Sequence, residues 1–263
     1  MKTAITGASG FVGRALCHAL GVQAIRQPRD ASLPRECEAV VHLAGIAHRA
    51  ASPAELEAAN VRMSERLGRE AAALGVPFLF VSSVKVHGEE SSSPLTERSP
   101  LVPQDPYGES KARAEEALRR IGGLRLTVLR PPLVYGPGVR ANFLALMRAL
   151  ARGWPLPFAS IDNRRSFVYV GNLVDAIIRA LGTPGTFLVS DGPGVSTPDL
   201  CRQIGNALHR RARLFPFPPA MLPGRLARSL EVDDSALRAT LGWQPPSTLE
   251  AGLAATAQWF RSA

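Results

Sequence analysis

Short runs of apolar residues alternate along this chain with longer segments in which apolar residues recur at helical spacing. Strands are predicted for the runs at 2–6, 22–26, 39–43, 78–81, 125–129, 167–170 and 186–190. Helices are predicted for amphipathic segments at 14–20, 52–75, 107–120, 142–152 and 172–182, and for segments beginning at 196, 233 and 247. Because strands that alternate with helices are typical of parallel sheets, we predict an α/β fold.

A glycine-rich turn, GASGFVG at 7–13, separates the first predicted strand from the first predicted helix. Gly7 permits the tight turn, Gly10 lets the backbone approach a pyrophosphate, and Gly13 lets the helix pack on the strand. The helix N-terminus then faces the phosphates. We therefore predict a Rossmann-type, doubly wound, mostly parallel sheet that binds a dinucleotide.

The end of the second predicted strand bears on which dinucleotide is bound. A free ribose 2′-hydroxyl usually meets Asp or Glu there, but the sequence has no acid until Asp30. Arg26 and Arg29 suit a 2′-phosphate, which favours NADP, with NAD as the alternative. Two solvent-exposed loop arginines would give the same pattern.

Only about a dozen residues separate this strand from the next one, at 39–43, whereas a complete βαβ unit takes roughly 30 residues. We predict that the sheet lacks one outer strand here. The adenine end of the cofactor site should then be open.

The predicted helix 52–75 begins with a capping box, Ser52 to Glu55, and Asn60 lies within its apolar series. A buried Asn60 would need a hydrogen-bond partner. The loop 84–106 is longer than most loops in compact domains, and such loops are usually functional or disordered. Because it joins Ser83 to Tyr107, we predict that it forms a wall of the active site.

Two helix starts are also predicted near the C-terminal half. Asn172 is expected to cap a helix that ends near Gly182, and Ser247 with Glu250 forms a second capping box.

The length of 263 residues suits one large domain or a domain with a smaller lobe. We assign 1–140 to an NAD(P)-binding domain, to which 166–190 returns, and 141–263 mainly to a small α/β lobe for the substrate.

The composition of the chain indicates which kinds of ligand and which cellular location to expect. The net charge of +9, from 31 basic and 22 acidic residues, attracts polyanions. The arginines are scattered without an aromatic-interleaved basic stripe, which favours small anionic ligands over nucleic acid. Three widely spaced cysteines indicate neither a disulfide framework nor a zinc site, and we expect no metal. No apolar run approaches the length of about 20 residues that a membrane span needs, no signal peptide is evident, and a cytoplasmic location is expected.

Tyr107 and Lys111 lie four residues apart, so a helix would place both on one face. A phenol is almost fully protonated at neutral pH, and a nearby ammonium lowers its pKa. Such a tyrosine can exchange a proton with a carbinol oxygen while hydride moves on the adjacent carbon. By itself the spacing also occurs on ordinary solvated helix faces.

Together these features resemble the extended short-chain dehydrogenase/reductase family that modifies nucleotide sugars, the NAD-dependent epimerase/dehydratase family. The matching stretches are 6–13, 42–44, 82–83, 107–111, 130–131 and 163–168. The resemblance implies that Ser83 holds the substrate oxygen beside Tyr107, the proton donor or base. Lys111 would bind the nicotinamide ribose and lower the tyrosine pKa.

The resemblance also implies a set of binding contacts. Cofactor contacts are implied for Gly7, Gly10, Phe11, Val12, Gly13, Leu43, Ala44, Ser82, Tyr107, Lys111 and Pro131, to which the charge argument adds Arg26 and Arg29. Substrate contacts are implied for Ser83, Asn142, Arg165 and Arg225, since a guanidinium can make paired bonds to phosphate oxygens. Family members often pair through two helices, which in a homodimer of this chain would be 53–74 and 107–120; the sequence itself does not show whether two subunits pair.

One departure from the family excludes a reaction. Its 4,6-dehydratases carry Asp-Glu directly after the catalytic hydroxyl, where this chain has Val84 and Lys85. At 83–86, 131–138 and 187–192 the chain looks most similar to bacterial O-antigen and capsule enzymes that reduce UDP-4-keto-6-deoxy-N-acetylhexosamine at C4. We therefore expect an NAD(P)H-dependent C4 reductase of a UDP-linked 4-keto-6-deoxy sugar. The alternatives are a UDP-hexose or N-acetylhexosamine 4-epimerase with tightly bound NAD, and a non-catalytic NADP-sensing or nucleic-acid-binding Rossmann protein.

Overall fold

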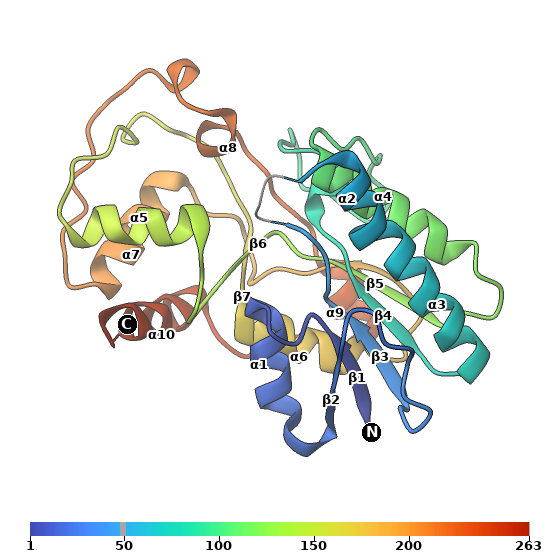
Figure 1. The fold of residues 1–263 in the computed structure, drawn as a ribbon. Coiled ribbons are helices and arrows are strands. Elements are labelled where there is room, and N and C mark those ends of the chain that lie inside the picture. The colour runs from blue at the N-terminus through green and yellow to red at the C-terminus, as the bar shows by residue number, and fades with distance from the viewer. Residues whose placement is uncertain (48–50, 263) are drawn as a thin grey trace.

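A computed structural model describes residues 1–47 and 51–262, without the side chain of Arg225. Six parallel strands form the main sheet, in the order β2-β1-β3-β4-β5-β8 (Figure 1). Their bounds are β1 Thr3–Thr6, β2 Ala24–Gln27, β3 Ala39–His42, β4 Phe78–Val81, β5 Leu126–Arg130 and β8 Gly185–Leu188. The predicted α/β, doubly wound and mostly parallel fold is confirmed.

Alternate residues of each strand pack on opposite faces of the sheet, as the two-residue period of a strand requires. Helices cover both faces. One core contains Ile5, Val41, Leu79 and Leu129 together with residues of α1 Phe11–Leu20, α6 Val170–Ala180 and α9 Ser235–Leu241. The other contains Ala4, Val40, Phe80 and Val128 together with residues of α3 Met63–Leu74 and α4 Pro106–Arg119.

Strand β2 is an edge of the main sheet among the described residues, which confirms the predicted missing outer strand. The chain returns from β2 to β3 through a short loop held by the Gln27 side chain. Its Nε2 donates to the carbonyl oxygens of Ala31 and Ser32, each over 2.9 Å. The outer side of β2 is thus not covered by a further strand of residues 1–47 or 51–262.

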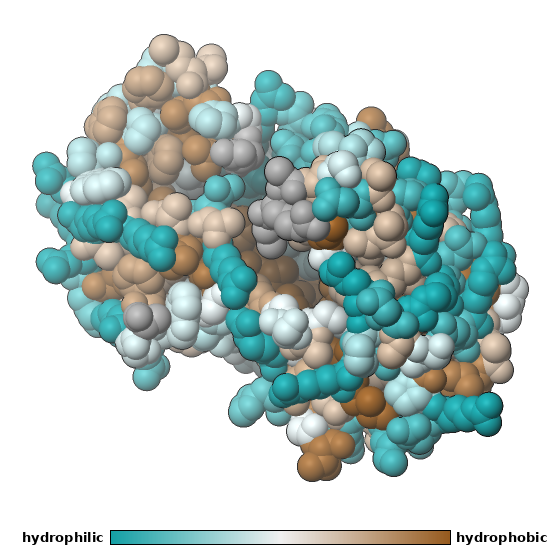
Figure 2. All heavy atoms as spheres, viewed as in Figure 1, coloured by the Kyte–Doolittle hydropathy of each residue, from teal (hydrophilic) through white to brown (hydrophobic). Residues whose placement is uncertain are grey.

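The C-terminal half builds a second group of elements around its own apolar core, which includes Tyr135, Phe143, Leu200 and Leu253. Strands β6 Leu133–Tyr135 and β7 Phe167–Tyr169 pair in parallel as a separate sheet. The helices are α5 Ala141–Ala151, α7 Thr197–Ala207, α8 Gly224–Ala227 and α10 Leu249–Ser262. Figure 1 shows α5, α7 and α10 on the side of the molecule away from α3 and α4, and Figure 2 shows the surface hollowed between the two groups. The proposed boundary between 140 and 141 stays a prediction.

The long helix predicted for 52–75 is interrupted. It consists of α2 Pro53–Leu56, the π-helical turn η2 Glu57–Arg62, and α3. The Ser52–Glu55 capping box is present, and Gly75 ends the helix in the left-handed conformation. Wider π-helical turns often occur at functional sites, and this one contains Asn60.

Two predicted helix caps are wrong. Asn172 lies inside α6 and not at its N-terminus. Its side-chain Nδ2 donates to Asp191 and to the carbonyl oxygen of Ser247, and it does not cap the helix. At the last helix Thr248, and not Ser247, accepts the backbone N–H of Ala251. Ser247 is already engaged through its own N–H, which donates to Asn172.

Across residues 1–47 and 51–262, no helix is long and apolar enough to cross a bilayer. The short helical turns that complete the fold are η1 Gly21–Gln23, η3 Val84–His87 and η4 Pro219–Met221.

Candidate active site

The glycine turn lies against the end of β3. Gly7 has a φ of 70°, and a Cβ there would lie 2.8 Å from the backbone nitrogen of Ala44. A Cβ on Gly13 would lie 2.1 Å from the carbonyl oxygen of Gly7. The structure thus brings Gly7, Gly13, Leu43 and Ala44 together, and the close backbone approach explains why glycine occupies these positions.

The first turn of α1 supplies the other residues of this edge. Gly10 is its N-cap, and Gly10 N–H donates to the carbonyl oxygen of Gly7 over 2.9 Å. Phe11 and Val12 follow in the first turn and are half-buried. Arg14 is exposed and donates to the carbonyl oxygen of Ser9. Arg14 was not singled out from the sequence, although it directly follows the third glycine at the helix end that favours anions.

Ser83 and its neighbours follow β4. The hydroxyl oxygen of Ser83 accepts from the backbone N–H of Lys85 over 3.2 Å and caps η3. Ser82 is 3% exposed, and its hydroxyl lowers the pKa of Glu115. The carbonyl oxygen of Pro131 accepts from the N–H of Val84 over 2.9 Å. Ser83 is the half-buried member of the serine pair, whereas Ser82 lies inside the protein.

Tyr107 lies in the first turn of α4, which Asp105 caps by accepting the N–H of Gly108 over 2.6 Å. The Ser83 hydroxyl is close enough to the phenol to lower its pKa, so the structure brings these two predicted catalytic residues together. Burial raises the pKa of Tyr107 to about 12, a hydrogen bond with Ser83 lowers it, and the charge of Asp105 raises it.

The expectation that Lys111 lowers the pKa of Tyr107 is wrong for this structure. Lys111 Nζ donates to the carbonyl oxygen of Val81 over 2.9 Å and lies 4.4 Å from the ring centroid of Phe80. Burial lowers the pKa of Lys111 to about 8. The ammonium is therefore directed to the end of β4, and burial determines the pKa of the phenol.

Lys111 nevertheless reaches the cofactor edge predicted for it. A Cβ on Gly45 would lie 3.7 Å from Lys111 Nζ and 2.9 Å from Asn60 Oδ1. Gly45 directly follows Ala44, which packs on Gly7. A continuous series of contacts thus connects Lys111 with the glycine turn, so the predicted catalytic and cofactor residues share one edge of the sheet.

Asn60 joins this edge to the helix that carries Tyr107. Asn60 Oδ1 accepts the N–H of Ile46 over 2.8 Å, while Nδ2 donates to the carbonyl oxygen of Ile46 and to Ser110 Oγ. Ser110 Oγ in turn donates to the carbonyl oxygen of Tyr107 over 2.8 Å. The expectation that Asn60 needs a partner is confirmed.

A buried polar network behind the site was not found from the sequence. Glu115 on α4 pairs with Arg130 at the end of β5 through Nε–Oε1 and Nη2–Oε2 distances of 3.0 and 2.6 Å. Arg130 Nη1 donates to His87 Nε2 over 3.0 Å, and His87 Nδ1 donates to the carbonyl oxygen of Pro100. Because a guanidinium only donates and a carbonyl only accepts, His87 is neutral. The network fastens the 84–106 loop to α4.

The residues predicted to contact the nucleotide are more dispersed. Arg165 is half-buried, and its Nη1 donates to the carbonyl oxygen of Arg228 over 2.9 Å. Asn142 is exposed in the first turn of α5. The side chain of Arg225 lies outside the described part of the protein. The sequence analysis did not single out Arg228, whose side chain forms an ion pair with Glu90.

Arg26 and Arg29 are both exposed at the open side of the sheet, on β2 and in the loop after it. Their exposure leaves them accessible to a ligand at the adenine end. Among residues 1–47 and 51–262 there is no cluster of three or more side chains that could hold a metal ion.

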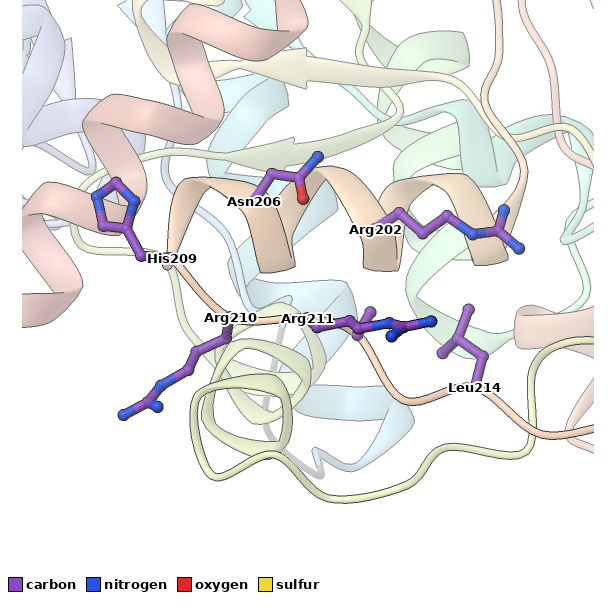
Figure 3. Close-up of a pocket in the computed structure, with 7 residues that line it drawn as sticks. Arg202, Asn206, His209, Arg210, Arg211 and Leu214 are labelled. Carbon is purple, nitrogen blue, oxygen red and sulfur yellow. The ribbon is translucent and has the colours of Figure 1, made fainter.

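A cavity of about 670 Å³ lies elsewhere, at the C-terminal end of α7 (Figure 3). It is lined by Arg202, Asn206, His209, Arg210, Arg211, Ala212 and Leu214. In Figure 3 the side chain of Arg210 points away from those of Arg202 and Arg211. Because these three arginines are exposed and do not converge, they form a solvated surface and not a built anion site.

Comparison with known proteins shows which family the chain belongs to. A model of the NAD dependent epimerase/dehydratase family matches residues 28–189. The chain belongs to this family. The UDP-glucose 4-epimerase of Vibrio cholerae is 35% identical over 98% of this chain and 95% of its own length. This confirms the resemblance found from the sequence and the prediction that the chain is an enzyme.

Two further similar proteins share a smaller fraction of identical residues with this chain. The UDP-2-acetamido-2,6-beta-L-arabino-hexul-4-ose reductase of Pseudomonas aeruginosa is 26% identical over 69% of this chain and 50% of its own length. The structure of RMD from Pseudomonas aeruginosa, complexed with NADPH, superimposes with a TM-score of 0.83 at 23% identity, covering 100% of this chain and 98% of that one. The structural likeness shows a shared fold.

Proposed function

We propose that this epimerase/dehydratase family member performs NAD(P)-dependent redox chemistry at C4 of a UDP-linked sugar. The observation that carries the proposal is the meeting of Ser83, Tyr107 and Lys111 at the edge that also bears the glycine turn. The Ser83 hydroxyl lowers the pKa of Tyr107, and Lys111 reaches Gly45 beside the turn. An acid–base pair beside a dinucleotide site is the arrangement that carbinol–carbonyl interconversion requires.

The roles of the residues follow from their contacts. The nicotinamide cofactor supplies or accepts hydride when bound. Ser83 orients the substrate C4 oxygen, and Tyr107, which is protonated at neutral pH, gives that oxygen its proton. Lys111 holds the cofactor ribose, and Gly7, Gly10 and Gly13 leave room for the pyrophosphate at the start of α1.

The finer proposal is reduction of a UDP-linked 4-keto-6-deoxy sugar. The cofactor of a reductase must exchange in every turnover, and the uncovered edge at β2 leaves the adenine end open for exchange. The Pseudomonas aeruginosa relative named as a 4-ulose reductase supports this choice. The exposed Arg26 and Arg29 are available for a 2′-phosphate, which supports NADP as the preferred cofactor.

Dehydration is not supported by the side chains after Ser83. The positions that carry Asp-Glu in the resembling dehydratases hold Val84 and Lys85 here. The carboxylates nearest to Lys85, Asp105 and Glu89, are ion-paired with it. Neither is left as an unpaired general acid or base beside the serine.

A second candidate is 4-epimerisation, which the Vibrio cholerae UDP-glucose 4-epimerase relative favours because the match spans nearly both chains. The two functions use the same acid–base residues. They differ in whether hydride leaves with the product or returns to the same carbon, and therefore in whether the cofactor stays bound.

The deciding experiment uses the purified full chain. Its absorbance spectrum and a mass spectrum of the denatured supernatant report any retained NAD, and UDP-4-keto-6-deoxy-N-acetylhexosamine and UDP-glucose are then assayed with and without NADPH or NADH. A reductase arrives without cofactor and consumes one reduced cofactor per sugar. An epimerase retains NAD and converts UDP-glucose without added reductant. Absence of both turnovers would refute the proposal.

A further inference from the structure

Lys85 is one of three lysines in a chain with 31 lysines and arginines, and it bridges the two segments that carry Ser83 and Tyr107. Its backbone N–H donates to Ser83 Oγ over 3.2 Å. Its Nζ forms an ion pair with Asp105 Oδ2 and another with Glu89 Oε1 over 2.8 Å. One residue therefore contacts the serine through its backbone and the N-cap of α4 through its side chain.

The backbones of these two segments are also in direct contact. A Cβ on Gly108 would lie 2.6 Å from the carbonyl oxygen of Lys85, so glycine lets the first turn of α4 approach η3. Asp105 uses Oδ1 for the N–H of Gly108 and leaves Oδ2 for Lys85. The carboxylate thus holds the turn of Tyr107 on one side and the turn of Ser83 on the other.

The same contact has an electrostatic consequence. The charged groups around the first turn of α4 include Glu109 and Lys111 on α4, Lys85 in η3, Glu89 after η3, and Asp105 at the cap. Of these, Asp105 raises the pKa of Tyr107 after the larger effect of burial. Burial disfavours the Lys85 ammonium, but the hydrogen bonds and charges of Asp105 and Glu89 outweigh it and raise the pKa of Lys85. Lys85 therefore stays charged and opposes the field of Asp105.

We propose that Lys85 is a positioning residue for the Ser83–Tyr107 pair: it clamps Asp105 between η3 and α4 and balances its charge beside the phenol. The inference rests on the proposed function, in which these two hydroxyls act on the C4 oxygen. Lys85 occupies a position at which the 4,6-dehydratases carry an acidic residue. In this chain the same position would orient the two hydroxyls instead.

The test compares Lys85→Met, which keeps much of the stem without the charge, with Lys85→Arg, which keeps the charge. Lys85→Met should lower kcat roughly ten- to a hundredfold, the scale expected for a misplaced catalytic group, with the NADPH dissociation constant unchanged. The Tyr107 phenol should become harder to ionise, because Asp105 is then unopposed. Lys85→Arg should retain most of the rate.

The double variant Lys85→Met/Asp105→Asn distinguishes the effect of the unopposed Asp105 charge on Tyr107 from a general loss of protein stability. Asn keeps an acceptor for Gly108 but removes the charge, so the electrostatic effect on Tyr107 should be reversed. Arg202→Met, which removes an exposed ion pair with Asp199, is the matched control and should not change kcat. An unchanged kcat in Lys85→Met would overturn the inference.

An activity-independent measurement keeps this test distinct from the proposed function. The chain has three tyrosines, so carbon-13 labelling at tyrosine Cζ gives three resonances, and Tyr107→Phe identifies the one from Tyr107. That resonance should shift in Lys85→Met and return in the double variant, even if no nucleotide sugar is turned over. A resonance that does not move in a folded Lys85→Met protein contradicts the clamp, whereas absent turnover in the unaltered chain contradicts only the proposed function.

Discussion

Replacing Arg130 by Met tests the buried network that supports the site. Arg130 and Glu115 side chains are 3% and 0% exposed, and the substitution leaves the Glu115 carboxylate with Arg119 and the Ser82 hydroxyl. Breaking a buried pair by removing one partner costs about 3–5 kcal/mol. We expect about 3 kcal/mol from the pair because Arg119 remains. The lost donor to His87 Nε2 adds about 1 kcal/mol.

A loss of about 4 kcal/mol in the free energy of unfolding corresponds to a fall in melting temperature of about 10 °C for a protein of this size. The assay is thermal unfolding followed by circular dichroism. Arg119→Met is the matched control, since it removes the 41% exposed partner of the same carboxylate. Such an exposed pair contributes about 0–1 kcal/mol, so this control should melt within about 3 °C of the unaltered protein.

The pH dependence provides an independent check. Burial alone would raise the pKa of Glu115, but the hydrogen bond and charge of Arg130 outweigh it and lower the pKa. The resulting stabilisation is present above the unfolded pKa and is lost as the pH falls through the folded one. In Arg130→Met, burial dominates and Glu115 gains stability by protonating in acid. The loss in unfolding free energy of Arg130→Met relative to the unaltered protein should therefore shrink from pH 8 to pH 5. A loss that grows in acid, or that equals the loss in Arg119→Met, refutes the reasoning.

Three further predictions concern separate features. Gly13→Ala should abolish NADPH binding or folding, measured by cofactor fluorescence titration and circular dichroism, because its Cβ would lie 2.1 Å from the Gly7 carbonyl oxygen; wild-type affinity would contradict this. Tyr135→Phe should lower the unfolding free energy by about 1–3 kcal/mol in denaturant titrations, because the phenol donates to Asp191 over 2.9 Å; an unchanged midpoint would show that this bond is dispensable. NADPH affinity should weaken as the pH rises through about 8, where Lys111 loses its proton; an effect that persists in Lys111→Met would exclude Lys111 as its source.

The main sheet was predictable because its strands are short runs rich in apolar residues. Strand β4 matches the predicted 78–81, since buried parallel strands need apolar residues on both faces. The missing outer strand followed from chain length alone, because too few residues lie between β2 and β3 for a crossover. The glycine turn was predictable because its spacing reflects backbone contacts that only glycine permits.

Features that depend on tertiary partners were not predictable. The π-helical turn surrounds Asn60, whose partners Ile46 and Ser110 are distant in sequence. Asn172 resembles a helix cap until its bonds to Asp191 and Ser247 are seen.

The electrostatics of the site show the same limit. The spacing of Tyr107 and Lys111 predicts that both share a helix face, but it does not give the bond that directs the ammonium to Val81. The pKa of the phenol depends on burial and on Ser83 and Asp105. Asp105 itself carries a readable signal, an acid before Pro106 at a helix start.

The rate of hydride transfer to C4 in Tyr107→Phe tests the central claim most directly. Deuterium-labelled NADPH is mixed with UDP-4-keto-6-deoxy-N-acetylhexosamine in a single turnover, and deuterium at C4 of the product is measured by mass spectrometry and NMR. We predict deuterium at C4 with the unaltered enzyme and a rate about 10²–10⁴-fold lower in Tyr107→Phe, the usual contribution of a general acid, with unchanged NADPH affinity. An unaltered rate in Tyr107→Phe, or label at another carbon, would contradict the account.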